Sequence, residues 1–172
     1  MIIRLAERVL KTTFGTYSEI LYYDGQSESI ALVMGDVEGQ KNVLCRVHSS
    51  CVSAHVFNTI ECECRDEMEW SQAMIERNGM GVIIWLDQEG RGNGHLALME
   101  SIKFKAAGFS QSDAYEKAGY KADARSFRPA AEILTELKVK SVILLTNNPK
   151  KAEDLRRASI IVPDTRLIER PS

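Results

Sequence analysis

Hydrophobic and polar positions follow two different patterns along this chain, and the pattern changes near residue 50. The first part consists of short β-rich runs separated by turn sequences that contain glycine and aspartate, which predicts an antiparallel meander. The expected meander strands are residues 3–10, 16–23 and 30–35. A fourth strand is expected over residues 42–48.

In the second part, helical patterns alternate with short apolar runs, which is typical of α/β layering around parallel strands. We expect buried strands at residues 81–86 and 141–145, and helices at residues 67–77, 97–107 and 129–137. No linker, repeat or low-complexity tract separates the two parts. We therefore expect one mixed α+β domain over residues 1–172, in which the β meander is joined to an α/β layered half.

Composition and charge limit the partners that this chain can have. Its 172 residues are 44% apolar and 27% charged, which is ordinary for a globular protein. With a net charge of -2 and a pI near 6.0, the chain has no global positive field that would hold nucleic acid or an anionic membrane. No apolar run approaches the roughly 18 residues of a membrane span, so we expect a soluble, cytoplasmic protein.

Three cysteines, Cys51, Cys62 and Cys64, lie close together in the sequence. In a reducing compartment, closely spaced thiols favour metal ligation over disulfides, and three are enough for a catalytic zinc with an open fourth position. Cys45 would complete a closed structural site of four thiolates, but strand alternation places it on the same face as two core valines. Reduced structural thiols are the alternative for the other three.

Two apolar runs are followed by loops that are typical of anion sites. Residues 87–94 combine glycines at alternate positions, which leave backbone amides free, with the planar cation of Arg91. Residues 144–151 place a proline behind an asparagine cap at a helix start, where Thr146 and Lys151 add a hydroxyl and a charge. Each loop alone is equally compatible with an ordinary surface turn or a capped helix.

Asp123 and Arg125 stand two residues apart and face one site if the segment is extended. A carboxylate beside an arginine stays ionised and orients the guanidinium toward a phosphate. Taken alone, such a pair is more often a surface ion pair.

Together these motifs resemble the GTP cyclohydrolase II family, zinc enzymes that open the guanine ring at the start of riboflavin synthesis. The resemblance extends to about residue 163 and rests on five short segments in the family's order. The segments are Arg46-Val47-His48-Ser49-Ser50-Cys51, Cys62-Glu63-Cys64, Gln88-Glu89-Gly90-Arg91-Gly92, Asp123-x-Arg125 and Leu144-Leu145-Thr146-Asn147-Asn148-Pro149-Lys150-Lys151.

The resemblance implies a role for each segment. Zinc would be held by Cys51, Cys62 and Cys64. Asp123 would be the acid/base, and Arg125 would act on the α-phosphate, as a nucleophile or, in keeping with its permanent charge, as an electrostatic stabiliser. The residues implied to contact GTP are Arg46, Val47, His48, Ser49, Ser50, Glu67, Glu89, Gly90, Arg91, Thr146 and Lys151. Magnesium would accompany the triphosphate, and the resemblance suggests a homodimer.

The implied reaction opens the imidazole ring of guanine at C8 and releases pyrophosphate, which gives a pyrimidine nucleotide monophosphate. Ile102 stands where the family has a tyrosine that is thought to assist the later release of formate. Because isoleucine offers no proton and no hydrogen bond, we expect the product to keep its formyl group. Glu67 stands where the family has a glutamine, and its carboxylate can still accept hydrogen bonds from guanine.

A second interpretation is a catalytically weak or inactive paralogue that binds guanine nucleotides and keeps a structural zinc site. Retention of the three thiols together with Asp123 and Arg125 favours the enzyme, because a binding protein has little need for an open metal position beside such a pair. The departures from the family pattern suggest a role in specialised metabolism.

Overall fold

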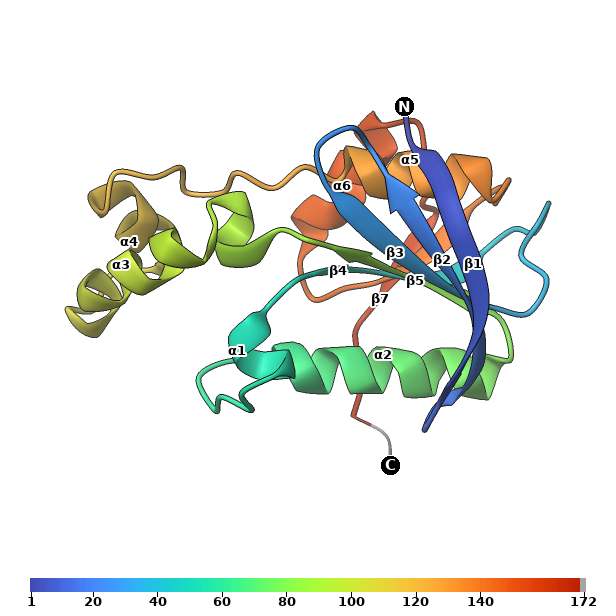
Figure 1. Cartoon of the computed structure of the whole chain (residues 1–172), viewed down its shortest axis with the longest axis horizontal. Helices are drawn as coiled ribbons and strands as arrows, with labels where there is room; N and C mark the ends of the chain where they lie inside the picture. Colours follow the sequence, from blue (N-terminus) through green and yellow to red (C-terminus); the bar gives the residue numbers. More distant parts are fainter. Residues whose placement is uncertain (171–172) are drawn as a thin grey trace.

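A mixed β-sheet of seven strands organises the computed structural model, which describes residues 1–170 (Figure 1). The strand order is β1-β2-β3-β5-β4-β6-β7. The strands are β1 (Ile3–Thr12), β2 (Gly15–Tyr23), β3 (Glu28–Met34), β4 (Val43–Ser49), β5 (Gly81–Leu86), β6 (Val142–Leu145) and β7 (Asp164–Arg166). The helices are α1 (Val52–His55), α2 (Cys64–Asn78), α3 (His95–Ala106), α4 (Gln111–Lys117), α5 (Arg128–Glu136) and α6 (Pro149–Arg157), with a 3-10 turn η1 (Glu89–Gly92).

The predicted antiparallel meander is confirmed, because β1 pairs with β2 and β2 pairs with β3 in antiparallel register. The two-residue hairpin between β1 and β2 ends at Gly15, whose φ of 93° suits glycine. Strand β4 does not extend the meander. Instead β5 pairs antiparallel with β3 on one side and parallel with β4 on the other, so β5 joins the two halves of the sheet.

The expected parallel strands form the centre of the sheet, where β4 lies between β5 and β6. Helix α2 covers one face and contributes Ile75 to a cluster with Ile83 of β5. Helices α5 and α6 cover the other face, where Ile133 and Leu155 pack against β4 and β5 (Figure 1). Because both faces are covered, six of the seven residues of β4 are buried.

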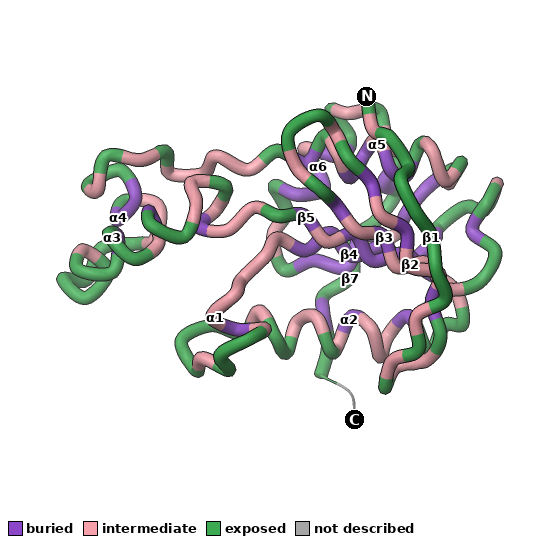
Figure 2. Tube along the Cα trace, in the orientation of Figure 1, coloured by how far each residue is buried: buried purple, intermediate pink, exposed green. Residues whose placement is uncertain are grey.

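Helices α3 and α4 form an arm that stands out from the sheet (Figures 1 and 2). They pack mainly against each other, and most of their residues are exposed or half-buried. The arm leaves the sheet through η1 after β5 and returns through residues 120–127 to the start of α5. The structure therefore holds two helices over the ends of the parallel strands without adding a second sheet.

Most expected elements are present within a few residues of their predicted bounds. Helix α6 begins as predicted, with Pro149 in its first turn and the Asn148 side chain accepting a hydrogen bond from the Lys150 amide at 3.0 Å. Helices α1 and α4 and strand β7 were not predicted, because each is too short to give a clear period. Among residues 1–170, no helix is both long and apolar enough to cross a membrane.

Candidate active site

The candidate site lies at one edge of the sheet, where the parallel strands β4, β5 and β6 end. The carboxyl ends of parallel strands meet at the same edge, which is where open α/β sheets bind ligands. Hydrogen bonds join the first two strand ends: the Ser50 amide donates to the Leu86 carbonyl at 2.9 Å, and the Gln88 amide donates to Ser50 Oγ at 2.9 Å. The predicted segments after these strands are therefore neighbours in space.

A cavity of about 680 Å³ collects most of the predicted site residues. Those that line it are Arg46, His48, Ser49, Ser50, Cys51, Cys62, Cys64, Glu67, Glu89, Gly90, Arg91, Arg125 and Lys151. Val47, Asp123 and Thr146 lie outside its lining. Asp123 adjoins the cavity through its ion pair with Arg125, and the backbone carbonyl of Val47 accepts a hydrogen bond from Lys151.

The three predicted thiols converge on one point at the cavity wall. The sulfur atoms of Cys51, Cys62 and Cys64 lie within 4.8 Å of one another, and those of Cys51 and Cys62 are 3.8 Å apart. Two sulfurs bound to one tetrahedral zinc at ~2.3 Å are about 3.8 Å apart, so the donor set and its spacing fit zinc. Burial raises the pKa of the Cys51 and Cys64 thiols, so a metal must displace their protons when it binds.

Local structure on both sides of the thiol cluster fixes its position. Cys51 directly precedes α1, and Glu89 Oε2 accepts a hydrogen bond from the Val52 amide at 2.8 Å, which ties η1 to this helix start. Cys64 is the first residue of α2, where the positive end of the helix dipole favours an anionic thiolate. Cys62 lies in the loop between the two helices.

Cys45 does not belong to this cluster. It is fully buried in the core between the sheet and helices α5 and α6, on the opposite side of β4 from Arg46. Burial raises the pKa of its thiol to about 12, which is unsuited to a thiolate ligand. The alternative of four thiolates is therefore wrong, and the placement of Cys45 by strand alternation is confirmed.

Arg46 is the most deeply buried cation of the cavity, with 3% of its surface exposed. It donates to Glu67 Oε2 at 2.6 Å and to the Leu145 carbonyl at 3.2 Å. Burial lowers the pKa of Arg46, and the Glu67 carboxylate opposes that shift. The pair thus connects β4 to α2 and presents both side chains to the cavity.

His48 is held neutral beside Arg46. Burial, with the charge of Arg46 adding to it, lowers the pKa of His48 to about 2. The Arg46 guanidinium lies 3.3 Å from His48 Nδ1, and because arginine has only donors, Nδ1 must accept. The ring proton then lies on Nε2, which has no hydrogen-bond partner among the described residues.

The loop after β5 has three successive residues with positive φ: Gly90 at 60°, Arg91 at 54° and Gly92 at 81°. A positive φ is strained for a non-glycine residue such as Arg91. The Arg91 side chain donates to Ser112 Oγ at 2.8 Å, which fastens η1 to α4. A Cβ atom at Gly92 would lie 2.8 Å from the backbone carbon of Ala124. Only glycine therefore allows residues 123–125 to pass this close to the loop.

Asp123 and Arg125 form a two-point ion pair, with contacts of 3.0 and 2.7 Å. Burial alone would raise the pKa of Asp123, but hydrogen bonds from the side chain and amide of Arg125, with the charge of Lys150, lower it to about 2. Asp123 is consequently a carboxylate at neutral pH. Its geometry holds the Arg125 guanidinium in a fixed orientation at the cavity wall.

Lys151 reaches the cavity from the first turn of α6, and its ammonium donates to the Val47 carbonyl at 3.0 Å. Burial, followed by repulsion from Arg46 and Arg125, lowers the pKa of Lys151 to about 7. The Thr146 hydroxyl is used within its own turn, where it accepts from the Asn148 amide at 2.9 Å.

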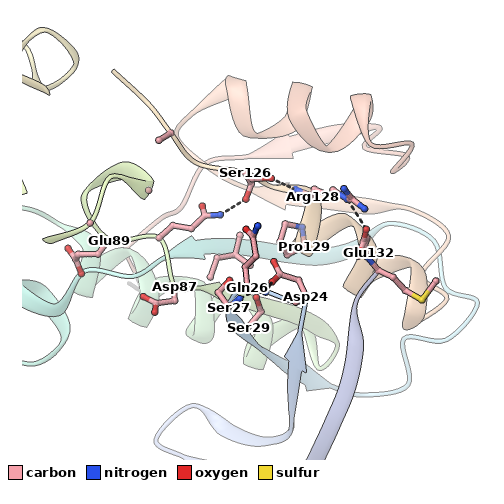
Figure 3. A pocket seen from close by; sticks show the side chains of 17 residues that line it. Asp24, Gln26, Ser27, Ser29, Asp87, Glu89, Ser126, Arg128, Pro129 and Glu132 are labelled. Atoms are coloured by element: carbon pink, nitrogen blue, oxygen red, sulfur yellow. Dashed lines mark hydrogen bonds and ion pairs between the residues drawn. The ribbon is translucent and has the colours of Figure 1, made fainter. Parts of the chain in front are cut away.

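A second cavity, of about 850 Å³, lies beside the turn between β2 and β3 and the start of α5 (Figure 3). Its wall carries carboxylates, neutral polar groups and Arg128, which donates to Glu132 at 2.8 Å. The thiols and most of the cations line the smaller cavity instead. The candidate chemistry therefore belongs to the smaller cavity.

The arm brings residues into the smaller cavity that the sequence pattern did not single out, above all Tyr115 of α4. Ile102 of α3 also lines it, with 51% of its surface exposed. The signal that was missed is the cap of α4, where the Ser110 side chain accepts a hydrogen bond from the Asp113 amide. A serine followed three residues later by an acidic residue is a helix-start pattern.

Comparison with known proteins gives a family match over almost the whole chain. A sequence model described as GTP cyclohydrolase II matches residues 3–166. Similar curated proteins include "Riboflavin biosynthesis protein RibBA" of Bacillus cereus, 38% identical over 174 residues, and that of Bacillus mycoides, 37% identical over 174 residues. Each alignment covers 100% of this chain and 44% of the relative, so the chain spans less than half the length of these proteins.

Among solved structures, the chain is similar to RibBX, a two domain 3,4-dihydroxy-2-butanone 4-phosphate synthase from A. baumannii. The TM-score is 0.47 at 18% sequence identity, and the alignment covers 86% of this chain and 34% of the other. Similarity at this level carries no information about activity.

The close approach at Gly92 predicts that Gly92→Ala lowers the free energy of unfolding by about 2–4 kcal/mol, the sum of backbone strain and a steric clash. It should also remove hydrogen-exchange protection from the Ala124 amide, which donates to the Arg91 carbonyl at 2.9 Å. Gly94→Ala is the matched control, because Gly94 has a φ of 93° with no atom within 4 Å of the added Cβ. Equal protection of Ala124 in both variants would contradict the predicted clash.

Proposed function

Because the chain belongs to the GTP cyclohydrolase II family, we propose that it is a zinc-dependent hydrolase that opens the imidazole ring of GTP at C8 and releases pyrophosphate. The product is a pyrimidine nucleotide monophosphate. The observation that carries this proposal is the presence of a three-thiol cluster and several fixed cations on the wall of one cavity. A metal that activates water and cations that hold phosphates are the two requirements of this reaction.

Cys51, Cys62 and Cys64 would hold the zinc. The chemistry that zinc supplies at a site with three protein ligands is Lewis-acid activation of water near neutral pH. Glu89 supports this site, because it accepts a hydrogen bond from the Val52 amide and so fixes the backbone next to Cys51. The three cysteines line the cavity in which the purine ring would lie.

The guanine ring would be recognised at the Arg46 end of the cavity. Glu67 gives one carboxylate oxygen to Arg46, which leaves its second oxygen to accept hydrogen bonds from the N1 and amino protons of guanine. His48 and the Ser49 hydroxyl, each with a buried polar atom that has no partner among residues 1–170, supply further hydrogen bonds at this end.

Arg91, Arg125 and Lys151 would bind the triphosphate, which Mg²⁺ would accompany. The ion pair with Asp123 presents Arg125 as a fixed planar cation, which supports electrostatic stabilisation at the α-phosphate over nucleophilic attack. As a carboxylate with a pKa of about 2, Asp123 can accept a proton but has none to donate at neutral pH. The Thr146 hydroxyl would have to leave its hydrogen bond to the Asn148 amide to reach the nucleotide.

Ile102 determines which product we propose. Attack of water at C8 followed by cleavage of the bond between C8 and N9 leaves C8 as a formyl group on N7. Removal of this group needs a second hydrolysis, and Ile102 presents only an aliphatic side chain to the cavity. We therefore propose that the formylated nucleotide is the product. We also propose that the reaction belongs to specialised metabolism and that the active form is a homodimer.

The alternative function is a catalytically weak or inactive guanine-nucleotide-binding protein with a structural zinc. The observation that favours it is that Ile102, rather than the family's tyrosine, lines the cavity. Release of pyrophosphate from GTP distinguishes the two, because a binding protein leaves the nucleotide intact.

Substitution of a thiol tests the zinc site. Cys62→Ser should lower zinc affinity by at least about 100-fold and abolish the ultraviolet change that accompanies ring opening, because one of three ligands is lost. Zinc content is measured by atomic absorption after dialysis. Cys45→Ala is the control and should keep the metal, because Cys45 lies in the core away from the cluster. Ring opening that survives in Cys62→Ser would exclude the zinc assignment.

Mass spectrometry of the product tests the role of Ile102. The wild-type chain, incubated with GTP, zinc and magnesium, should release pyrophosphate and give a nucleotide that is heavier by one carbonyl group than the deformylated pyrimidine. Ile102→Tyr should restore some release of formate. Stoichiometric formate from the wild-type chain would rule out the proposed product.

The pKa of Lys151 predicts a pH dependence of nucleotide binding. With a pKa of about 7, Lys151 of the free protein is mostly neutral above pH 7. It must then take up a proton to pair with a phosphate. GTP affinity should therefore weaken by up to about tenfold per pH unit between pH 7.5 and 8.5. Calorimetry in buffers of different ionisation enthalpy should detect proton uptake. Lys151→Met should bind GTP weakly and without this extra uptake, and identical proton uptake in both proteins would contradict the assignment.

A further inference from the structure

We propose that Tyr115 is a substrate-contacting residue whose hydroxyl donates a hydrogen bond to an acceptor atom of the bound nucleotide. The inference rests on the proposed function only for the identity of the ligand. Tyr115 belongs to none of the motifs that identify the family in this sequence, and it enters the cavity from α4, on the arm.

The first observation is the state of the hydroxyl group. Tyr115 is 1% exposed, which makes it one of three fully buried tyrosines in residues 1–170. The other two have partners, because the Tyr22 hydroxyl donates to Glu136 at 2.5 Å and the Tyr17 hydroxyl donates to the Gln72 carbonyl at 3.4 Å. The Tyr115 hydroxyl makes no hydrogen bond to any described residue. The Tyr115 oxygen is not fully enclosed by protein, and Tyr115 lines the cavity, so its hydroxyl is available to donate to a ligand there.

The second observation is the direction in which the hydroxyl lies. Tyr115 lines the cavity, and a Cβ atom built on Gly90 would be 3.6 Å from the Tyr115 oxygen. The hydroxyl thus lies close to Gly90, and Glu89, Gly90 and Arg91 line the same cavity. Arg91, Arg125 and Cys51 line the same cavity as Tyr115, so the phenol shares one wall with residues of the phosphate-binding and thiol ends of the site.

The chemistry of the phenol favours a donor to the ligand. Burial raises the pKa of Tyr115, so the hydroxyl stays protonated at neutral pH and donates a hydrogen bond more readily than it transfers a proton. The phosphate oxygens of a nucleoside triphosphate are hydrogen-bond acceptors. This role differs from the proton transfer that Ile102 is unable to perform, and it leaves the proposed formylated product unchanged.

The arm gives this contact a structural consequence. Ser112 and Tyr115 lie on α4, and Arg91 donates to Ser112 Oγ at 2.8 Å. A nucleotide that accepts from Tyr115 therefore joins α4 to the strand-end loops by a second link, in addition to the one that Arg91 provides. Specificity for the ligand would then depend on the arm as well as on the sheet.

The test is Tyr115→Phe in the zinc-loaded full chain, which removes the hydroxyl and keeps the ring. Without ligand, the thermal midpoint should not fall, because the hydroxyl has no partner within the protein to lose. The dissociation constant of GTP, measured by rapid mixing before turnover, should rise about tenfold. Tyr120→Phe is the matched control, three residues past the end of α4. The Tyr120 hydroxyl donates to Glu100 outside the cavity, so this variant should leave GTP affinity unchanged.

Two results would overturn the inference. An unchanged dissociation constant in Tyr115→Phe would show that the hydroxyl does not contact the nucleotide. A lower thermal midpoint without ligand would show that the hydroxyl has a partner within the protein and a structural role. Both results are independent of catalysis, whereas a wild-type chain that binds GTP and releases no pyrophosphate would contradict the proposed reaction and leave the result for Tyr115 intact.

Discussion

The parallel pairing of β4 between β5 and β6 is the constraint on which the rest of the site depends. Parallel strands end at the same edge of a sheet, so the segments that follow them are brought together whatever their separation in sequence. The thiol cluster follows β4, the glycine-rich turn follows β5, and Lys151 follows β6. The hydrogen bonds of Ser50 with Leu86 and Gln88 then fix the first two of these segments against each other.

Burial of cations is the main electrostatic feature of this edge. Arg46 and Lys151 are both almost inaccessible, and burial lowers the pKa of each. Burying a charge is costly unless it is paired, and here one carboxylate accompanies Arg46 while Lys151 has only a carbonyl. An anionic ligand in the cavity would relieve this cost, which is the physical reason to expect a nucleotide phosphate rather than a neutral metabolite.

The cavity takes its residues from two parts of the fold, the sheet edge and the arm. The thiols and most of the cations come from the sheet edge, whereas Ile102 and Tyr115 come from α3 and α4. Arg91 connects the two parts through Ser112, and Gly92 allows the returning segment to pass beside the loop. Ile102 and Tyr115, on which the proposed product and the proposed nucleotide contact depend, therefore lie on different elements from the thiol cluster.

Local chemistry made much of this protein predictable from its sequence. The periods of the β-rich and helical runs predicted the meander, the parallel strands and the longer helices, and alternation along residues 42–48 separated Cys45 from Arg46 and His48. The spacing of the other three cysteines predicted a cluster of possible metal donors, and the structure brings their sulfur atoms within 4.8 Å of one another.

Only the tertiary structure decided which of these residues meet. Insertion of β5 between β3 and β4 depends on pairing between distant segments, which no local pattern encodes. The same is true of the contact between Gly92 and Ala124, of the burial that sets the pKa of Lys151, and of the unpaired hydroxyl of Tyr115. Each depends on what lies across the cavity rather than on neighbours along the chain, because burial and hydrogen-bond partners are properties of the folded whole.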